Sequence, residues 1–305
     1  MKITREELKY KQSRPLSEKI EMSQCIIEQW WGHWSGSVYV AFSGGKDSSV
    51  LLNLVRGIFP DIPAVYSDTG LEYPEVKQHV KSVENVTILR PKMTYRQVID
   101  KYGYPMISKE QSRYLYEYRI SHSEKLKNIR INGNRWGMGK VSKKWLFLID
   151  APFKISHKCC DALKKNPIVT YERKSGRKPY LGMLATESSM RTETYLRFGC
   201  NAFDTKRPTS NPLSFWNEQD ILEFIVQHNV KIPSVYGDII RQDDGTLKTS
   251  GVNRTGCMWC LFGIQRETEP NRIQKLKETH PKIYEYIIND LKINDVLDYI
   301  NVPYE

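Results

Sequence analysis

A short glycine-rich segment has the residue types that bind phosphate. It consists of Ser43, Gly44, Gly45, Lys46, Asp47 and Ser48. Glycines let the backbone approach an anion closely, and free N–H groups at a helix N-terminus attract negative charge. Lys46 can neutralise phosphate charge, Asp47 can bind Mg²⁺ that bridges phosphate oxygens, and the serine hydroxyls can donate hydrogen bonds. The spacing matches neither the Walker A motif nor the dinucleotide fingerprint. The segment predicts a phosphate-binding loop, and the alternative is a tight turn that happens to be glycine-rich.

A second polar segment contains Asp68, Thr69 and Gly70. It follows an expected strand at Ile62–Ser67, so its polar groups are expected at the carboxyl edge of a parallel sheet, where ligands bind. We expect Asp68, Thr69 and Gly70 to contact the same ligand as the glycine-rich segment. The alternative is that Asp68 and Thr69 only cap the next helix.

Four of the six cysteines form two pairs that could hold a metal centre. Cys159 and Cys160 are adjacent, and Cys257 and Cys260 are spaced as CxxC. Zinc is usually bound through two CxxC-like turns, which an adjacent pair fits poorly. A cubane cluster has separate iron corners, so neighbouring thiolates can each bind one. An iron–sulfur cluster, a zinc ion and unligated core thiols are the three alternatives, and the other two cysteines are expected to be buried or incidental.

The elements expected around these motifs alternate between strands and helices. The run Val38–Phe42 is apolar and rich in β-formers, and further strands are expected at Ile62–Ser67 and around Val86–Leu89. Helices are expected near 73–83 and 94–101, between and after these strands. This alternation predicts an α/β fold with a doubly wound parallel sheet.

The remaining pattern suggests how the chain is divided. We expect an N-terminal helical segment at 1–34, a nucleotide-binding α/β domain at 35–200 and a C-terminal region at 201–305 with the CxxC pair and terminal helices. A basic insertion is expected at about 106–150, where the α/β pattern weakens. Residues 231–256 are expected to be loop-rich.

Positive charge is concentrated in one part of the chain. The net charge is +11, and residues 101–180 hold 19 Lys/Arg and six Asp/Glu, so the other 225 residues sum to −2. Such clustering is the electrostatic signature of a polyanion partner, and the alternative is a solvated, lysine-rich surface. Tyrosines and tryptophans interleaved with these charges could stack on bases, or could pack the segment against the domain.

The composition also excludes several classes of protein. With 40% hydrophobic and 27% charged residues, the chain as a whole is not disordered, and no apolar run reaches 18 residues, so we expect no membrane span. The charged first residues contain no apolar core, which predicts no secretory signal. We therefore expect a cytoplasmic protein whose cysteines are free thiols or metal ligands.

Several motifs carry a family resemblance. The string SGGKDS resembles the PP-loop of the ATP pyrophosphatase superfamily, whose members cleave ATP between the α and β phosphates and adenylate a substrate. The pattern DTGxExPE at 68–75 resembles the phosphoadenosine phosphosulfate reductase branch of that superfamily. The later motifs resemble, in order and spacing, the iron–sulfur members of the branch: a Cys-Cys segment at 159–167, a Ser/Arg motif at 182–191, PLxxW at 212–216 and CxxC at 257–260. The resemblance implies a helical C-terminal iron–sulfur region and a [4Fe-4S] cluster bound by all four paired cysteines, with zinc as the weaker alternative.

Three departures bear on the reaction. Sulfonucleotide reductases have an altered glycine loop, whereas the intact loop here points to ATP itself as the nucleotide. Those reductases also use a nucleophilic cysteine near the C-terminus, and no cysteine follows Cys260 in this chain. Met183 and Leu184 occupy the place where an arginine is often found, which leaves Arg191 as the candidate for anion contact. The alternative for Arg191 is a surface ion pair.

Together, these observations predict an enzyme similar to the sulfur-incorporation protein of DNA phosphorothioation systems and, more distantly, to the iron–sulfur tRNA thiolases. We expect it to convert ATP to AMP and pyrophosphate, and to adenylate an acceptor for sulfur transfer, with Lys46, Asp47 and Arg191 as catalytic residues. The expected cofactors are ATP, Mg²⁺ and the [4Fe-4S] cluster. The expected partners are DNA or tRNA at residues 101–180 and a sulfur donor such as a cysteine desulfurase. The alternatives are a sulfonucleotide reductase with a non-standard thiol and a non-catalytic, nucleotide-sensing regulator that binds nucleic acid.

Overall fold

The structure is a computed structural model that describes residues 3–305. These residues form two compact units, each made of segments that are separate along the chain. The first unit contains residues up to 67, 73–89 and 168–255, and the second contains 68–72, 90–167 and 256–305. The three consecutive segments expected from the sequence divide the chain differently, because compactness groups residues that are far apart along it.

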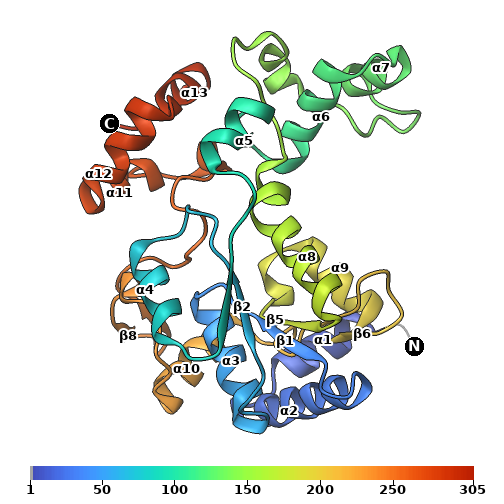
Figure 1. Cartoon of the computed structure of the whole chain (residues 1–305), viewed down its shortest axis with the longest axis vertical. Coiled ribbons are helices and arrows are strands. Elements are labelled where there is room, and N and C mark those ends of the chain that lie inside the picture. The colour runs from blue at the N-terminus through green and yellow to red at the C-terminus, as the bar shows by residue number, and fades with distance from the viewer. Residues whose placement is uncertain (1–2) are drawn as a thin grey trace. The chain divides into compact units, whose positions relative to one another are not determined.

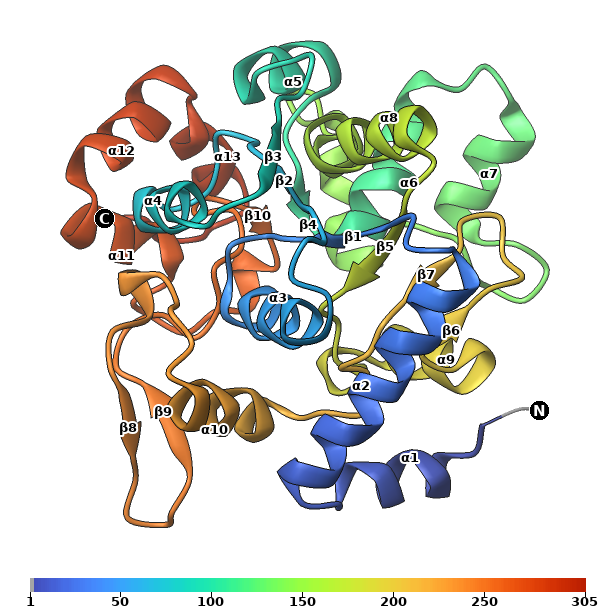
Figure 2. The same ribbon diagram turned by 60° about the horizontal axis from the view of Figure 1, so that its bottom comes forward.

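The first unit is built on a six-stranded sheet with the order β3-β2-β1-β5-β7-β6 (Figure 1 and Figure 2). Its strands are β1 (Val38–Ala41), β2 (Ala64–Ser67), β3 (Val86–Leu89), β5 (Lys178–Leu181), β6 (Asn201–Ala202) and β7 (Thr209–Ser210). All pairs are parallel except β6 with β7. The predicted α/β fold with a mostly parallel sheet is thus confirmed. The chain runs outward from β1 to β3 and then places β5 on the other side of β1, so the strand order reverses beside β1.

Helices cover this sheet because each has one apolar face. They are α1 (Arg5–Gln12), α2 (Leu16–His33), α3 (Lys46–Ile58), α4 (Pro74–Ser82), α9 (Ser189–Phe198) and α10 (Glu218–His228), and α8 (Asn166–Ser175) leads into this unit. Helix α3 packs against β1 and β5, and α2 and α10 lie against α3. The side chains that α3 buries include Leu51, Leu54 and Val55, which share one face of the helix.

The N-terminal helical stretch is two helices, α1 and α2, and Pro15 separates them. Proline has no backbone N–H and disfavours helical geometry in the residue before it, so the helix stops and restarts there. Thr4 begins α1 with a capping box that includes Glu7.

Part of the stretch at 231–256, expected to be loop-rich, is a hairpin of β8 (Ile239–Arg241) and β9 (Leu247–Thr249). Gly245 allows the turn, since its φ is +81°. The side chain of Gln219 on α10 donates to the carbonyl of Leu247 at 2.9 Å and accepts from its N–H at 2.7 Å. These bonds fix the hairpin to α10.

The second unit is mainly helical. It contains β4 (Met106–Ile107), β10 (Leu261–Phe262), α5 (Tyr95–Tyr102), α6 (Lys109–Ile120), α7 (Glu124–Asn132), α11 (Arg272–Thr279), α12 (Pro281–Glu285) and α13 (Ile293–Tyr299). Strands β4 and β10 pair in parallel, with Met106 opposite Leu261. Both side chains are buried, as are Leu115, Leu148 and Ile293, and they give this unit its own core.

Among the described residues, none of the helices is both long enough and apolar enough to cross a lipid bilayer.

Candidate functional site

The glycine-rich loop at 43–48 joins β1 to α3, as predicted, with Gly45 as the N-cap of the helix. Gly44 has a φ of +75°. A Cβ at Gly44 would lie only 2.7 Å from Val80 and 2.8 Å from Val76 on α4. Its dihedral angle and its neighbours both exclude a side chain, so the loop needs glycine at this position.

Two serines fix the shape of the loop. The N–H of Ser43 donates to Oγ of Ser48 at 3.2 Å, and the Ser48 hydroxyl donates to the carbonyl of Gly45 at 2.9 Å. Ser48 is buried, whereas Ser43 is exposed. The Ser43 hydroxyl lies 3.0 Å from that of Ser48 and accepts from the N–H of Gly45 at 3.4 Å, so both hydroxyls bond within the loop, and only Ser43 is also exposed to solvent.

Tyr236 and Thr255 cover the second glycine. The buried hydroxyl of Tyr236 accepts a hydrogen bond from the N–H of Lys46 at 3.1 Å and lies 2.8 Å from the Thr255 hydroxyl. A Cβ at Gly45 would lie 2.8 Å from Thr255 Oγ1 and 3.1 Å from the Tyr236 oxygen. Burial raises the pKa of Tyr236, although its hydrogen bonds to Thr255 and Lys46 oppose the shift. The hydroxyl thus stays protonated, and it bonds the first amide of α3.

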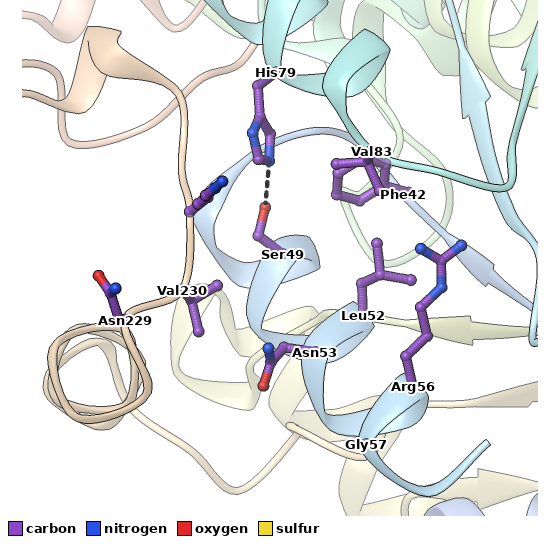
Figure 3. Close-up of a pocket in the computed structure, with 11 residues that line it drawn as sticks. Phe42, Ser49, Leu52, Asn53, Arg56, Gly57, His79, Val83, Asn229 and Val230 are labelled. Atoms are coloured by element: carbon purple, nitrogen blue, oxygen red, sulfur yellow. Dashed lines mark hydrogen bonds between the residues drawn. The ribbon is translucent and has the colours of Figure 1, made fainter. Parts of the chain in front are cut away.

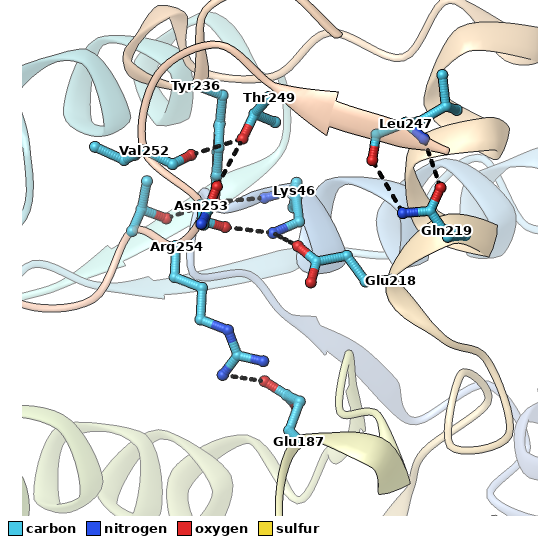
Figure 4. Close-up of polar contacts among 11 residues, drawn as sticks. Lys46, Glu187, Glu218, Gln219, Tyr236, Leu247, Thr249, Val252, Asn253 and Arg254 are labelled. Carbon is cyan, nitrogen blue, oxygen red and sulfur yellow. Dashed lines mark hydrogen bonds and ion pairs between the residues drawn. The ribbon is translucent and has the colours of Figure 1, made fainter. Parts of the chain in front are cut away.

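The Lys46 side chain is buried and points toward the segment that follows β9 (Figure 4). Its Nζ donates to the carbonyl of Asn253 at 2.5 Å and lies 3.1 Å from a carboxylate oxygen of Glu218, the first residue of α10. The Glu218 side chain is 51% exposed. One partner of the ammonium is therefore fixed backbone, and the other is a carboxylate that water can reach.

Asp47 lies among cations. Burial raises the pKa of its carboxyl group, while Lys46, Arg254 and Arg191 act in the opposite direction. Within residues 3–305, its carboxylate has no hydrogen-bond or ion-pair partner. A partly buried carboxylate without a partner is suited to bind a divalent cation.

Glu187 holds two of these cations together. Arg254 lies 3.2 Å from one of its oxygens (Figure 4). Arg191 forms an ion pair with the other oxygen. Burial lowers the pKa of Arg191, and the nearby Arg254 lowers it further. The ion pair considered as the alternative for Arg191 is present, and the same guanidinium also acts on Asp47.

The segment after β5 meets the loop after β1. A Cβ at Gly182 would lie 3.0 Å from the carbonyl oxygen of Asp47, so a side chain there would crowd the loop backbone. Both segments follow the carboxyl ends of their strands at the point where the strand order reverses. This is where open α/β sheets bind ligands. The loop, the three cations and Asp47 therefore form a candidate site for an anionic ligand.

A separate pocket of about 530 Å³ lies beside α3 (Figure 3). It is lined by α3, by α4 and by residues that follow α10. Two of its lining residues are hydrogen-bonded to each other, since Ser49 Oγ and His79 Nε2 are 3.2 Å apart. Burial lowers the pKa of His79. None of the predicted nucleotide-binding residues lines this pocket.

Asp68, Thr69 and Gly70 belong to the second unit. The hydroxyl of buried Thr69 donates to Glu72 at 2.6 Å, its N–H donates to the other oxygen of Glu72 at 3.1 Å, and the N–H of Gly70 donates to Asp68 at 3.2 Å. The carbonyl of Leu71 accepts from the N–H of Met258 at 2.8 Å. This turn therefore lies against the CxxC segment, and its predicted contact with a nucleotide stays a prediction.

The four paired cysteines are brought into one neighbourhood within the second unit. Cys159 is buried, and its pKa is raised by that burial and by the other three thiols. Burial raises the pKa of Cys257 to about 11, against the effect of Lys164, which donates a hydrogen bond to that thiol. A backbone hydrogen bond from Phe262 opposes the rise that burial causes in the pKa of Cys260.

Two buried donors near these thiols have no hydrogen-bond partner among the described residues: the hydroxyl of Tyr95 and the indole N–H of Trp259. Burial and three of the thiols raise the pKa of Tyr95 well above its ordinary value. The two rings are 6.2 Å apart. In the part of the chain that the structure describes, no three His, Cys, Asp or Glu side chains are arranged to hold a metal ion. Unpartnered donors beside thiols fit a group with sulfur acceptors.

Comparison with known proteins identifies the family. Residues 37–261 match the model of the phosphoadenosine phosphosulfate reductase domain. The chain belongs to this family. Membership of the reductase-domain family supports an enzyme of sulfur metabolism.

Individual relatives of this reductase-domain protein are distant. The chain is 22% identical to the uncharacterized protein MJ0066 and 24% identical to MJ0973, both of Methanocaldococcus jannaschii, over 84% and 90% of its length. It spans 41% and 53% of those proteins, about half of their length. It is 21% identical to the adenosine 5'-phosphosulfate reductase of Bacillus velezensis over 35% of the chain and 48% of that protein. A phosphoadenylyl-sulfate reductase structure from Candida auris aligns with a TM-score of 0.40 and 13% identity, over 84% of this chain and 99% of the other.

Sequence reasoning missed several residues of the site in this family member. Tyr236, Asn253 and Arg254 come from a stretch expected to be loop-rich, and Glu218 lies outside every motif described in the sequence. Arg254 precedes the CxxC motif by three positions, so its closeness to a recognised motif was the one signal available. Nothing in one sequence marks a tyrosine 190 positions after the loop as its partner.

Proposed function

We propose that this protein is an ATP-dependent adenylating enzyme that prepares an oxygen of a nucleic-acid acceptor for replacement by sulfur. The observation that carries the proposal is the intact loop at 43–48 on the first turn of α3. Lys46, Arg191 and Arg254 all act on Asp47 beside this loop, where the strand order reverses.

The charges support a polyphosphate ligand. Lys46 is paired with Glu218, whose half-exposed carboxylate can be hydrated when it separates from the buried ammonium. A phosphate oxygen can then take its place on the ammonium. Glu187 keeps Arg191 and Arg254 together, so both guanidinium groups are positioned before a ligand arrives.

In the proposed first step, an acceptor oxygen forms a bond to the α-phosphorus of ATP. The bond between that phosphorus and the bridging oxygen breaks, and pyrophosphate leaves with the electron pair. Lys46 and the loop amides stabilise the charge that develops on the leaving group. Asp47 would hold Mg²⁺, which supplies charge neutralisation on the phosphate oxygens.

In the proposed second step, a nucleophile of the hydrosulfide class bonds to the acceptor atom that carries the adenylated oxygen. The bond between that atom and the oxygen breaks, and AMP leaves with the oxygen and the electron pair. Cys159, Cys160, Cys257 and Cys260 would hold a [4Fe-4S] cluster in the second unit. A cluster held there would supply sulfur-binding and electron-transfer chemistry. Lys164 and the backbone of Phe262 bond to two of these thiols and favour their thiolate form.

Nucleic acid is the proposed acceptor because of the charge on residues 101–180, whose net value is +13. Lysine and arginine side chains neutralise phosphates along a nucleic-acid backbone, so binding should weaken steeply as salt concentration rises.

Pyrophosphate release from ATP tests the proposal. The protein is purified without oxygen, analysed for iron and sulfide, and incubated with ATP, Mg²⁺ and either tRNA or DNA. We expect nucleic-acid-dependent pyrophosphate release that Asp47→Asn abolishes, and four iron atoms per chain that Cys257→Ser depletes. Release by Asp47→Asn at the rate of the unaltered protein would refute the role of this site.

A sulfonucleotide reductase is the second candidate, favoured by the match to the adenosine 5'-phosphosulfate reductase of Bacillus velezensis. It is tested with adenosine 5'-phosphosulfate and reduced thioredoxin, and sulfite is the product to measure. We expect no sulfite. Turnover to sulfite without pyrophosphate release from ATP would replace the adenylation proposal with this one.

A further inference from the structure

We propose that residues 133–140, here called the stacking tip, bind an unpaired base of single-stranded nucleic acid through Arg135 and Trp136. The proposal rests on the proposed function in taking nucleic acid as the acceptor, and it specifies the form of nucleic acid and the residues that bind it. The tip directly follows α7 in the second unit (Figure 1).

Among the aromatic residues of the basic segment at 101–180, where Phe147 is 44% exposed, Trp136 is the most exposed. Its side chain is 63% exposed, whereas Trp145 and Tyr114 are 9% and 6% exposed and pack inside the unit. Met138, on the same tip, is 59% exposed. The guanidinium carbon of Arg135 lies 3.8 Å from the centre of the Trp136 ring. The tip thus presents a large ring to solvent together with a stacked cation.

Internal hydrogen bonds hold the tip in one conformation. The side-chain oxygen of Asn134 accepts from the N–H of Trp136 at 2.9 Å and from that of Met138 at 3.0 Å. The N–H of Asn134 donates to the carbonyl of Met138 at 2.8 Å. Gly133 has a φ of +92°, and a Cβ there would lie 2.8 Å from the backbone of Gly137. The ring is therefore preorganised, which lowers the entropy lost on binding.

Arg130 on α7 ties the tip to the helices below it. Its guanidinium donates to the carbonyl of Gly139 at 2.6 Å and to Glu117 on α6 at 2.7 Å. It also lies 4.5 Å from the ring centre of buried Tyr114. Through Arg130, the tip is thus held against α6 and α7, and α6 packs in the core of the second unit.

The positive charge around the tip favours a nucleic acid as its ligand. Residues 125–144 contain seven Lys/Arg and no Asp/Glu. Among these cations, Arg135, Lys140, Lys143 and Lys144 are exposed. An acidic peptide would also meet the charge, but it offers no flat face for an indole. A nucleotide offers a phosphate and a base, and only an unpaired base has a free face for stacking.

Fluorescence anisotropy with labelled oligonucleotides tests the tip, using a single-stranded oligodeoxyuridine, a single-stranded oligouridine and a DNA duplex. Trp136→Leu should weaken single-strand binding about 5- to 100-fold, the range expected for losing one base stack, while Trp136→Phe should keep most of the affinity. The dependence of affinity on salt should keep its slope in Trp136→Leu, because no charge is removed. Tyr10→Leu is the matched control, since Tyr10 is 62% exposed and Arg14 lies 5.3 Å from its ring.

Unchanged single-strand binding by Trp136→Leu would overturn the proposal, as would tighter binding of the duplex or no binding of either single strand. Loss of affinity for either single strand supports it, and the strand preferred identifies the sugar. Pyrophosphate release separates this proposal from the previous one. If Trp136→Leu loses binding but the unaltered protein releases no pyrophosphate, the adenylation proposal fails and the stacking tip stands.

Discussion

Replacing Lys46 with methionine should stop catalysis while leaving the fold nearly as stable. Methionine has a similar length and volume, so it fills the buried site without the charge. The ammonium that it removes is 3% exposed and bonds to the carbonyl of Asn253 and to Glu218. The substitution removes both contacts, but the Glu218 carboxylate is half exposed, so water can hydrate it in place of the ammonium.

The expected change in stability follows from these contacts. The ion pair to an exposed carboxylate contributes about 0–1 kcal/mol, and the hydrogen bond from a charged group about 1.5–3 kcal/mol. The desolvation cost of a buried ammonium, several kcal/mol, disappears with the charge. These terms oppose one another, so we expect the free energy of unfolding to change by no more than about 1.5 kcal/mol. Loss of a group that stabilises the leaving pyrophosphate should lower kcat about 100- to 1000-fold.

The two effects are measured separately. Urea denaturation followed by circular dichroism gives the free energy of unfolding, and a coupled pyrophosphate assay at saturating ATP gives kcat. Lys248→Met is the matched control, because Lys248 is an exposed lysine on β9 and lies outside the loop. We expect it to match the unaltered protein in both measurements.

Two results would refute this reasoning. If Lys46→Met kept kcat within about twofold of the unaltered protein, its ammonium would have no part in stabilising the leaving group. If it lost more than about 3 kcal/mol of stability, the ammonium would be needed chiefly for its bonds to Asn253 and Glu218.

Three further changes test the surroundings of the site. Tyr236→Phe removes the acceptor for the buried N–H of Lys46, so urea denaturation should show a loss of about 1–3 kcal/mol, and an unchanged midpoint would contradict that hydrogen bond. Lys19→Met leaves Asp220, 12% exposed, without its ammonium partner at 2.8 Å and should cost about 3 kcal/mol, which a lowered melting temperature would report and an unchanged one would exclude. Burial lowers the pKa of His79 below its ordinary value of 6.5, so the unfolded chain binds this proton more readily and stability should fall as the pH drops below 6.5. His79→Gln should lose less stability than the unaltered protein over that pH range, and parallel losses would show that His79 stays accessible to protons.

The sequence predicted those parts of the fold that depend on neighbours along the chain. The strands at Val38–Ala41 and Val86–Leu89 lie where they were expected, because apolar runs and the glycines that end them act locally. The loop at 43–48 was found for the same reason. The hairpin in 239–249 was missed because its strands have three residues each, too few to show a period.

The partners of the loop could not be predicted, because they depend on tertiary packing. Lys46 has the residue type for binding phosphate, but its bonds to Asn253 and Glu218 come from segments more than 170 positions away. The basic segment shows the same limit. Trp136 and Trp145 look equivalent in the sequence, and only the packed core of the second unit buries one and leaves the other exposed.

The order of the strands also constrains how this chain reaches its native state. Val38 on β1 pairs with Lys178 on β5, so about 140 residues, including much of the second unit, must be made before the centre of the sheet can close. Closing so long a loop costs entropy before it yields contacts, which slows folding. During synthesis, the edge of β1 that later receives β5 stays open, and a ribosome-bound intermediate with an unpaired strand is the species that a chaperone would be expected to protect.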